Sequence, residues 1–444
     1  MHIQLSDHFS YDRLIRFTLP SIAMMIFTSI YSVVDGFFVS NFAGKTPFAA
    51  VNMIIPMLMI LGTVGFMFGT GGTALVARAL GEGDRARANR YFSLFVYVAF
   101  ALGTALAVLG FIFIRPISSA LGAEGVLLDY CAVYGRIILT TLPFFVLQVM
   151  FQSFFVAAER PKLGLAVTVL SGATNMVLDA VLVLLLPQEL KLAGAAIATA
   201  MAQLVGGALP LFYFSRENSS VLRLGRTAFD GRALLRACTN GSSEFMSNIS
   251  MNIVGILYNL QLMRYAGENG VAAYGVMMYV SMIFSAAFIG FSIGVEPVVG
   301  YHFGACNHAE LRELLRKSLS LTGVFGVCMV ISAELLAAPL SKVFVGYDAE
   351  LFALTTSGFR IFALSFVFMG FGIFSSGFFT ALNDGLTSAL ISFLRTLVFQ
   401  SASILLLPLI WGVDGIWISV VAAELMAVLL SAIFLRAKRR KYRY

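Results

Sequence analysis

The sequence predicts an all-α integral membrane protein with twelve transmembrane helices arranged in two pseudo-symmetric six-helix lobes. Of its 444 residues, 59% are hydrophobic and only 12% are charged, with a mean hydropathy of +0.89. These charges are too few to cover a soluble surface of this size. Apolar runs of about 20 residues, the length that crosses a bilayer, recur along the whole chain. The second half of the chain also repeats the first at an offset of about 221 to 223 residues.

Twelve apolar spans are separated by short polar or glycine-containing breaks. Lipid offers no hydrogen bonds to the backbone, so each span is expected to be a helix. The spans cover residues 14–40, 48–78, 91–114, 130–157, 163–187, 192–214, 236–263, 271–302, 317–340, 357–381, 386–410 and 414–435. Several exceed the length needed to cross a bilayer, which predicts tilting.

The basic residues predict the orientation in the membrane. Of the 30 Lys and Arg residues, 22 lie on the side of both termini, many of them in the loop RALGEGDRARANR and the tail RAKRRKYR. The positive-inside rule therefore places both termini in the cytoplasm of a multi-pass protein of the plasma (inner) membrane. The net charge of +7 is thus explained by loops beside the membrane, and no nucleic-acid partner is expected. The polar N-terminus predicts no removable signal peptide.

Two segment pairs carry the internal repeat. FAGKTPFAAVNM from Phe42 matches YAGENGVAAYGVM from Tyr265, and GAAIATAMAQL from Gly194 matches GIWISVVAAEL from Gly415. Six spans return the chain to the side it left, so the two halves have the same orientation. The expected organisation is an N-lobe at 1–214, a cytoplasmic linker at 215–235, a C-lobe at 236–435 and a basic tail at 436–444.

Acidic residues inside the first lobe are the main functional candidates, because an ionisable group at mid-bilayer costs about 2.5 to 3.5 kcal/mol. Asp35 lies about four turns into span 1, while Asn175 and Asp179 share one face of span 5, and Thr199 lies in span 6. No basic residue within these spans is placed to neutralise the carboxylates. Their oxygens suit a metal ion such as Na⁺, and two nearby carboxylates suit H⁺. Taken alone, Asn175 or Thr199 is better explained as a hydrogen-bonding contact between helices.

The second lobe holds a separate set of polar candidates. Glu244 and Asn248 share a face early in span 7, where Glu244 either contacts a cationic substrate or lies near lipid headgroups. Glu296 in span 8 and Arg395 in span 11 are further candidates. The expected structural explanation of Arg395 is an ion pair with Glu296 or Glu424.

Four more residues complete the candidate list. Pro20 removes a backbone hydrogen bond near the start of span 1, and the resulting kink is either a moving part or a plain feature of the helix entrance. Tyr31, Gln148 and Gln152 are candidates for substrate contact. The four histidines and four cysteines show no metal-ligand spacing, and the sequence has no GxxxxGK[ST] loop for ATP. We therefore expect no enzyme and no cofactor, and transport that uses an ion gradient or none.

The chain resembles the multidrug and toxic compound extrusion (MATE) family over nearly its whole length, in particular its MepA-like or DinF-like bacterial branch. The resemblance rests on a GxGD-type loop after span 2 (residues 81–84), PVVGYHFGA at the end of span 8, and NMVLD in span 5 combined with an Asp 15 residues after Pro20. It implies a V-shaped antiporter that exports organic cations against inward flow of H⁺ or Na⁺. By resemblance, the cation ligands are Asp35, Asn175, Asp179 and Thr199, and span 1 bends at Pro20.

The resemblance also sets the expected partners and the rival functions. It implies small organic cation substrates, surrounding membrane lipid and a monomeric carrier, with coupling in the N-lobe because span 10 contains no Asp. The alternative is a lipid-linked precursor flippase of the same superfamily, which would need more basic residues in its spans than Arg395. A major facilitator exporter is excluded by its loop pattern, which ALGEGDRARANR does not fit.

Overall fold

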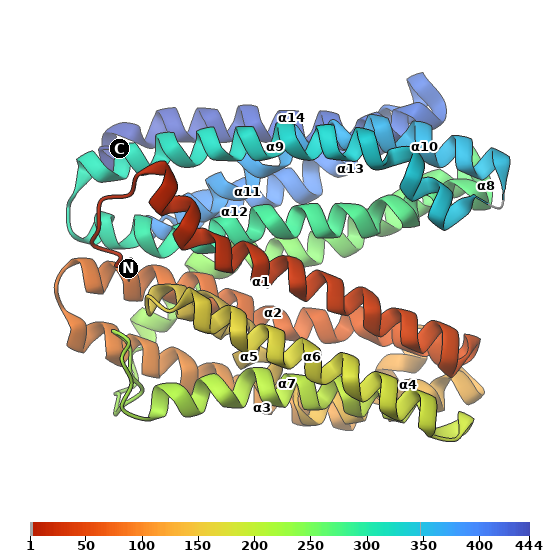
Figure 1. Ribbon diagram of the computed structural model, residues 1–444, viewed down its shortest axis with the longest axis horizontal. Coiled ribbons are helices and arrows are strands. Elements are labelled where there is room, and N and C mark those ends of the chain that lie inside the picture. The colour runs from red at the N-terminus through yellow and green to blue at the C-terminus, as the bar shows by residue number, and fades with distance from the viewer. Residues whose placement is uncertain (1–2, 347) are drawn as a thin grey trace.

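The computed structural model describes residues 3–346 and 348–444, and every regular element within them is helical (Figure 1). The α-helices are α1 (Tyr11–Phe38), α2 (Lys45–Gly81), α3 (Arg85–Ala120), α4 (Gly125–Thr140), α5 (Leu142–Ala157), α6 (Pro161–Leu185), α7 (Lys191–Ser215), α8 (Gly231–Gly304), α9 (His308–Val345), α10 (Ala349–Ala363), α11 (Phe366–Ala381), α12 (Gly385–Phe393), α13 (Gln400–Leu406) and α14 (Pro408–Tyr442). Short turns complete the set: the π-helical η1 (Val39–Ala43) and η3 (Leu394–Phe399), and the 3₁₀ turn η2 (Gln188–Leu190).

The described part of the chain makes twelve crossings, as predicted. Nine helical stretches are long and apolar enough to cross a membrane, and two bent pairs, α4 with α5 at 57° and α10 with α11 at 47°, raise the number to eleven. The 74-residue α8 supplies one more crossing, because its backbone leaves the helical region at Gly267, where φ is +60°. The spans expected at 130–157 and 357–381 are thus each divided into two helices by a bend. Pro143 in the first turn of α5 explains the first bend, because proline has no amide to bond back to the carbonyl of Leu139 in α4, and its ring clashes with that carbonyl in a continuous helix.

The helices form two layers, α1–α7 and α8–α14 (Figure 1). Both chain termini lie at one end of the molecule, which we call the terminal end. The connection between the layers, residues 216–230, is fixed to α3 by a hydrogen bond from the Arg223 amide to Asn89 Oδ1 (2.8 Å) and one from Tyr97 Oη to the Gly225 carbonyl (3.1 Å). The second layer therefore begins from an anchored linker.

Close backbone contacts join the two layers at the terminal end. A β-carbon placed on Gly71 of α2 would lie 2.1 Å from the carbonyl oxygen of Ala237, and one on Gly81 would lie 2.0 Å from that of Tyr301. Only glycine permits such an approach. The C-terminal half of α2 thus packs directly on both ends of α8.

Helix α1 contacts both layers. It packs along α6 in its own layer and against α8 in the other. A β-carbon on Gly290 of α8 would lie 2.6 Å from the Ile22 Cα atom, and one on Gly294 would lie 2.8 Å from the Thr18 side chain. The first half of α1 is therefore the part that contacts the second layer.

The basic tail predicted at 436–444 is the end of a helix, since α14 continues to Tyr442. Asp384, which caps α12, holds this end: its Oδ2 accepts a hydrogen bond from Tyr442 Oη (2.7 Å) and lies 3.4 Å from Lys438 Nζ. Burial alone would raise the pKa of Asp384, but the hydrogen bonds from Tyr442 and Thr387 and the charge of Lys438 outweigh it and lower that pKa. The carboxylate is therefore charged at neutral pH.

Tyr442→Phe is expected to lower the free energy of unfolding by about 1 kcal/mol, because one hydrogen bond to a carboxylate is lost. Since the pKa of Asp384 is lowered in the folded state, this contribution exists above the ordinary carboxyl pKa of about 4 and is lost as the pH falls through the lowered value. Thermal unfolding in detergent at neutral and acidic pH tests this. Arg440→Ala, on the exposed side of the same turn, should change nothing at either pH.

Candidate functional site

Three helices of the first layer bring the predicted cation ligands together. Asp35 comes from α1, Asn175 and Asp179 from α6, and Thr199 from α7. Thr199 Oγ1 donates to Asp35 Oδ1 at 3.4 Å, and Asn175 Nδ2 donates to Thr199 Oγ1 at 3.4 Å. Both contacts are long, which fits a polar cluster held loosely rather than a closed hydrogen-bond network.

The buried acceptor oxygens of this cluster lack donors. Asp179 is fully buried and Asn175 is 1% exposed. Among the described residues, no hydrogen-bond donor contacts either carboxylate oxygen of Asp179, and none contacts the amide oxygen of Asn175. The Asp35 and Asp179 carboxyl groups lie near enough to interact electrostatically. Unpaired buried oxygens are unfavourable unless a cation or a proton compensates them, so the chemistry of this donor set fits either one.

No basic side chain compensates the two carboxyl groups. In the part of the chain that the structure describes, neither Asp35 nor Asp179 takes part in an ion pair with Lys, Arg or His. Arg136, the nearest basic residue expected from the sequence, instead places its guanidinium 5.3 Å from the centre of the Phe111 ring. The local charge is therefore available to a mobile cation.

Three predicted candidates for substrate contact lie close to this cluster: Tyr31, Gln148 and Gln152. Gln148 Nε2 donates to Ser171 Oγ at 3.1 Å, and Ser171 Oγ donates to the carbonyl of Ala202 at 2.7 Å, which ties α5, α6 and α7 together. The Tyr31 hydroxyl interacts with both Gln148 and Asp35. Gln148 and Gln152, both 6% exposed, line a cavity with room for about one water. Their position favours support of the cation ligands over contact with a drug-sized molecule.

Two features of the site are absent from the sequence interpretation. Tyr134 of α4 is 2% exposed and interacts electrostatically with both Asp35 and Asp179. A buried tyrosine in an apolar helix is ordinarily a packing residue, so the sequence carries no specific signal for it. The second feature is η1, which begins one turn after Asp35. Such π-helical turns are frequent at functional sites.

Pro20 lies far from the cluster. It is buried inside α1, which remains a single helix from Tyr11 to Phe38. Fifteen residues separate Pro20 from Asp35, about 22 Å along a helix. Pro20 instead lies in the half of α1 that packs on Gly290 and Gly294 of α8. Any effect of Pro20 on the cation site must therefore travel along the helix.

The second layer pairs its buried arginine with a glutamate and holds two further carboxyl groups, those of Glu244 and Glu296. Arg395 Nε lies 2.8 Å from Glu424 Oε2, with side chains 13% and 3% exposed, so Glu424 is the partner among the two that the sequence offered. Glu296 is 6% exposed and accepts a hydrogen bond from Ser292 Oγ of its own helix (3.0 Å). Glu244 is half-buried and lies near enough to Arg395 for their charges to interact.

Asn248 does not join a polar site with the Glu244 side chain. Its Nδ2 donates to the backbone carbonyl of Glu244 at 2.8 Å, so the side-chain amide bonds within its own helix. Asn252 repeats the pattern on the carbonyl of Asn248 at 2.9 Å. These asparagines therefore satisfy local backbone acceptors.

The internal repeat places a neutral counterpart of the cation site in the second layer. An offset of 223 residues, taken from the Phe42–Tyr265 match, relates Asp35 to Tyr258, and an offset of 221, from the Gly194–Gly415 match, relates Asp179 to Gln400. Tyr258 Oη donates to Gln400 Oε1 at 3.0 Å and lies 2.7 Å from Ser419 Oγ. A phenol and an amide thus bond directly where the first layer has two carboxyl groups.

Twelve crossings in two repeated halves, with ionisable side chains buried inside the apolar helices, are typical of one class of membrane protein, the transporters. The chain belongs to the MatE family, whose model matches residues 20–181 and 245–403. It is therefore a multi-pass membrane transporter and not an enzyme.

Curated relatives extend this similarity along the whole chain. The chain is 24% identical over 433 residues to the multidrug export protein MepA of Staphylococcus haemolyticus (strain JCSC1435), a match that covers 97% of this chain and 94% of the relative. MepA of Staphylococcus aureus (strain MSSA476) is 22% identical over 420 residues, with 94% and 92% covered.

Solved structures share the fold. An outward-facing multidrug resistance MATE family transporter of the MOP superfamily superimposes with a TM-score of 0.92 at 20% identity, covering 98% of this chain and 97% of that one. A MATE protein in a bent conformation gives a TM-score of 0.87 at 20% identity, with 98% of both chains covered. The predicted MATE fold is confirmed.

Proposed function

We propose that this protein is a cation-coupled antiporter that exports organic cations, including drugs, across the plasma membrane in exchange for H⁺ or Na⁺. The observation that carries the proposal is the Asp35–Asp179 cluster: among the described residues, the buried carboxylate oxygens of Asp179 have no hydrogen-bond donor, and neither carboxyl group pairs with a basic side chain. The export function is supported by curated relatives that are multidrug export proteins over nearly the whole chain.

The proposed cycle is alternating access between the two lobes, 1–214 and 236–435. Entry of a cation among Asp35, Asn175, Asp179 and Thr199 removes negative charge and draws α1 towards α6 and α7. Because the other half of α1 packs on Gly290 and Gly294 of α8, a change in α1 alters the contact between the lobes. Pro20 lies in the segment that must adjust.

The proposed orientation follows from the basic loops and puts the terminal end in the cytoplasm. The glycine contacts between α2 and α8 then close the cytoplasmic side, which corresponds to an outward-facing carrier. In this state the cation site is reached from outside and the organic cation is released there. Glu244, half-buried and near Arg395, is the proposed charge that attracts the cationic substrate from the cytoplasm, with Glu296 behind it. We expect the carrier to work as a monomer.

The lipid-linked precursor flippase is not favoured. Such a protein needs cationic side chains in its central cavity to bind pyrophosphate. Arg395 is the candidate for that role, but its guanidinium is held by Glu424 at 2.8 Å. The curated relatives also bear the name of multidrug exporters.

Efflux from proteoliposomes under one imposed gradient at a time tests the proposal and identifies the ion. Vesicles are prepared with the same concentration of a fluorescent organic cation inside and outside, and a pH gradient or a Na⁺ gradient is then applied alone. We expect one gradient to drive dye movement against its concentration, with collapse of that gradient by an ionophore stopping it. Equal dye movement with no gradient would contradict antiport.

A further inference from the structure

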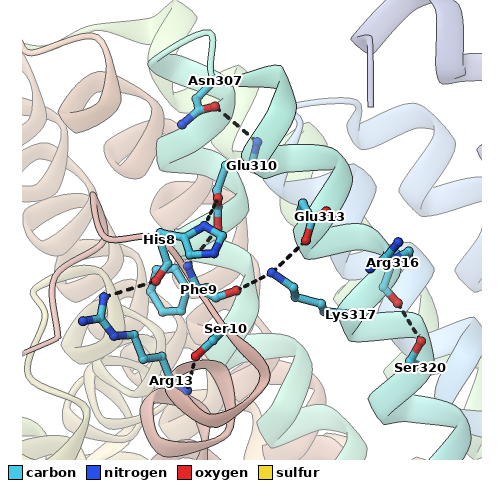
Figure 2. Close-up of polar contacts among 10 residues, drawn as sticks. All are labelled: His8, Phe9, Ser10, Arg13, Asn307, Glu310, Glu313, Arg316, Lys317 and Ser320. Carbon is cyan, nitrogen blue, oxygen red and sulfur yellow. Dashed lines mark hydrogen bonds and ion pairs between the residues drawn. The ribbon is translucent and has the colours of Figure 1, made fainter.

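The chain segment before α1, residues 3–10, is bonded to the second layer at the terminal end (Figure 2). His8 Nδ1 lies 2.6 Å from Glu310 Oε2, and the Phe9 amide donates to Glu310 Oε1 at 2.9 Å. Glu310 belongs to the first turn of α9, where its own amide is capped by Asn307 Oδ1 at 3.2 Å. One carboxylate therefore holds two successive residues of the segment.

A buried lysine of α9 also binds the N-terminal segment. Lys317 is 6% exposed, and its Nζ donates to the carbonyl of Phe9 at 2.8 Å and lies 2.9 Å from Glu313 Oε2. Glu310 is 7% exposed and Phe9 is fully buried. Buried charged groups are costly without partners, and both of these groups bond to the backbone of Phe9, in addition to His8 for Glu310 and Glu313 for Lys317. Glu310 and Lys317 of α9 thus form a binding site for that segment.

The same segment is also bonded to the first layer. The amide of Leu5 donates to Glu159 Oε1 at 2.7 Å, and the Leu5 side chain is 1% exposed. Glu159 lies between α5 and α6 with a φ of +59°, a left-handed conformation that few non-glycine residues adopt. Residues 3–10 therefore connect the α5–α6 turn to α9 across the terminal end.

We propose that residues 3–10 form a latch that holds the two lobes together on the cytoplasmic side and releases them for each transport cycle. The proposal rests on the alternating access described above. When the lobes part at the terminal end, Glu310 and Lys317 must leave Phe9 or pull the segment away from Glu159. The latch thus favours the outward-facing state without touching the cation site.

The test measures lobe separation directly in the full-length protein. The four native cysteines are replaced by serine, and spin labels are attached at Ala86→Cys on α3 and Arg312→Cys on α9, both exposed positions. Pulsed electron resonance in lipid nanodiscs gives the distances between the labels. Glu310→Ala removes both bonds to the segment, and Lys317→Met keeps the apolar stem but removes the bond to Phe9.

We expect Lys317→Met to increase the population with long label distances about tenfold, the effect of one lost charge-assisted hydrogen bond, and Glu310→Ala to increase it at least as much, because two contacts are lost. Arg316→Gln, at an exposed position of the same helix, is the matched control and should leave the distances unchanged. Correct folding of each variant is shown by an unchanged elution profile. Unchanged distances in both variants, or an equal change in Arg316→Gln, would overturn the latch. Because the measurement needs no ion gradient, its failure is distinct from failure of antiport.

Discussion

Asp35→Asn is expected to reduce gradient-driven dye efflux roughly 100-fold while the protein remains folded and in the membrane. Asparagine keeps the shape of the side chain and an acceptor for Thr199 Oγ1, but it removes the charge that attracts the cation. A loss of this size corresponds to about 3 kcal/mol of cation binding. Efflux from proteoliposomes under the driving gradient measures it.

Asp12→Asn is the matched control for this experiment. Asp12 lies on the same helix, but its side chain is 66% exposed and pairs with Arg16 at 2.9 Å in the first turns of α1. It should retain normal efflux. Asp179→Asn should behave like Asp35→Asn, because the two carboxyl groups share one site. Full efflux by Asp35→Asn would refute the assignment of the cation site.

Glu424→Ala should be the most destabilising single change outside the cation site. It leaves the guanidinium of Arg395, 13% exposed, without the carboxylate that lies 2.8 Å away. Removing one partner of a buried ion pair costs about 3 to 5 kcal/mol. Replacing both, with Arg395→Met and Glu424→Leu together, should recover most of that loss, because no unpaired charge then remains.

The pair Arg360–Glu334 provides the comparison. Its atoms are 3.7 Å apart and its side chains are 57% and 39% exposed, so Glu334→Ala should cost less than about 1 kcal/mol. Denaturant unfolding in detergent, followed by intrinsic fluorescence, measures all the variants. A Glu424→Ala loss no larger than that of Glu334→Ala would show that water reaches the Arg395 pair.

Helix periodicity and hydropathy predict most of the fold, and they also predict which residues make up the candidate site. Asn175 and Asp179 are four residues apart, so their common face is fixed by helix geometry alone, and the structure brings Asp35 and Thr199 to that face. Their role in cation binding stays a prediction. The choice of Glu424 over Glu296 for Arg395 depends on how the helices are rotated relative to one another, which a repeat of apolar residues does not specify.

Long-range polar contacts are the other part that the sequence does not reveal. Residues 3–10 read as an ordinary polar terminus, because their partners Glu159 and Glu310 lie 154 and 301 residues away from the amides they bind. The bends in α4–α5 and α10–α11 also escape a hydropathy profile, since a bent span is as apolar as a straight one.

The neutral Tyr258–Gln400 pair stands where the first layer has Asp35 and Asp179, and it sets the work of the proposed carrier if the first-layer site alone carries the ion. A single proton exchanged there for a singly charged cargo moves no net charge, so the membrane voltage contributes nothing. The thermodynamic ceiling on the cargo ratio is then about tenfold per pH unit, or roughly 1.4 kcal/mol. An uncharged cargo exchanged at the same stoichiometry would gain a further ~2.3 kcal/mol per 100 mV.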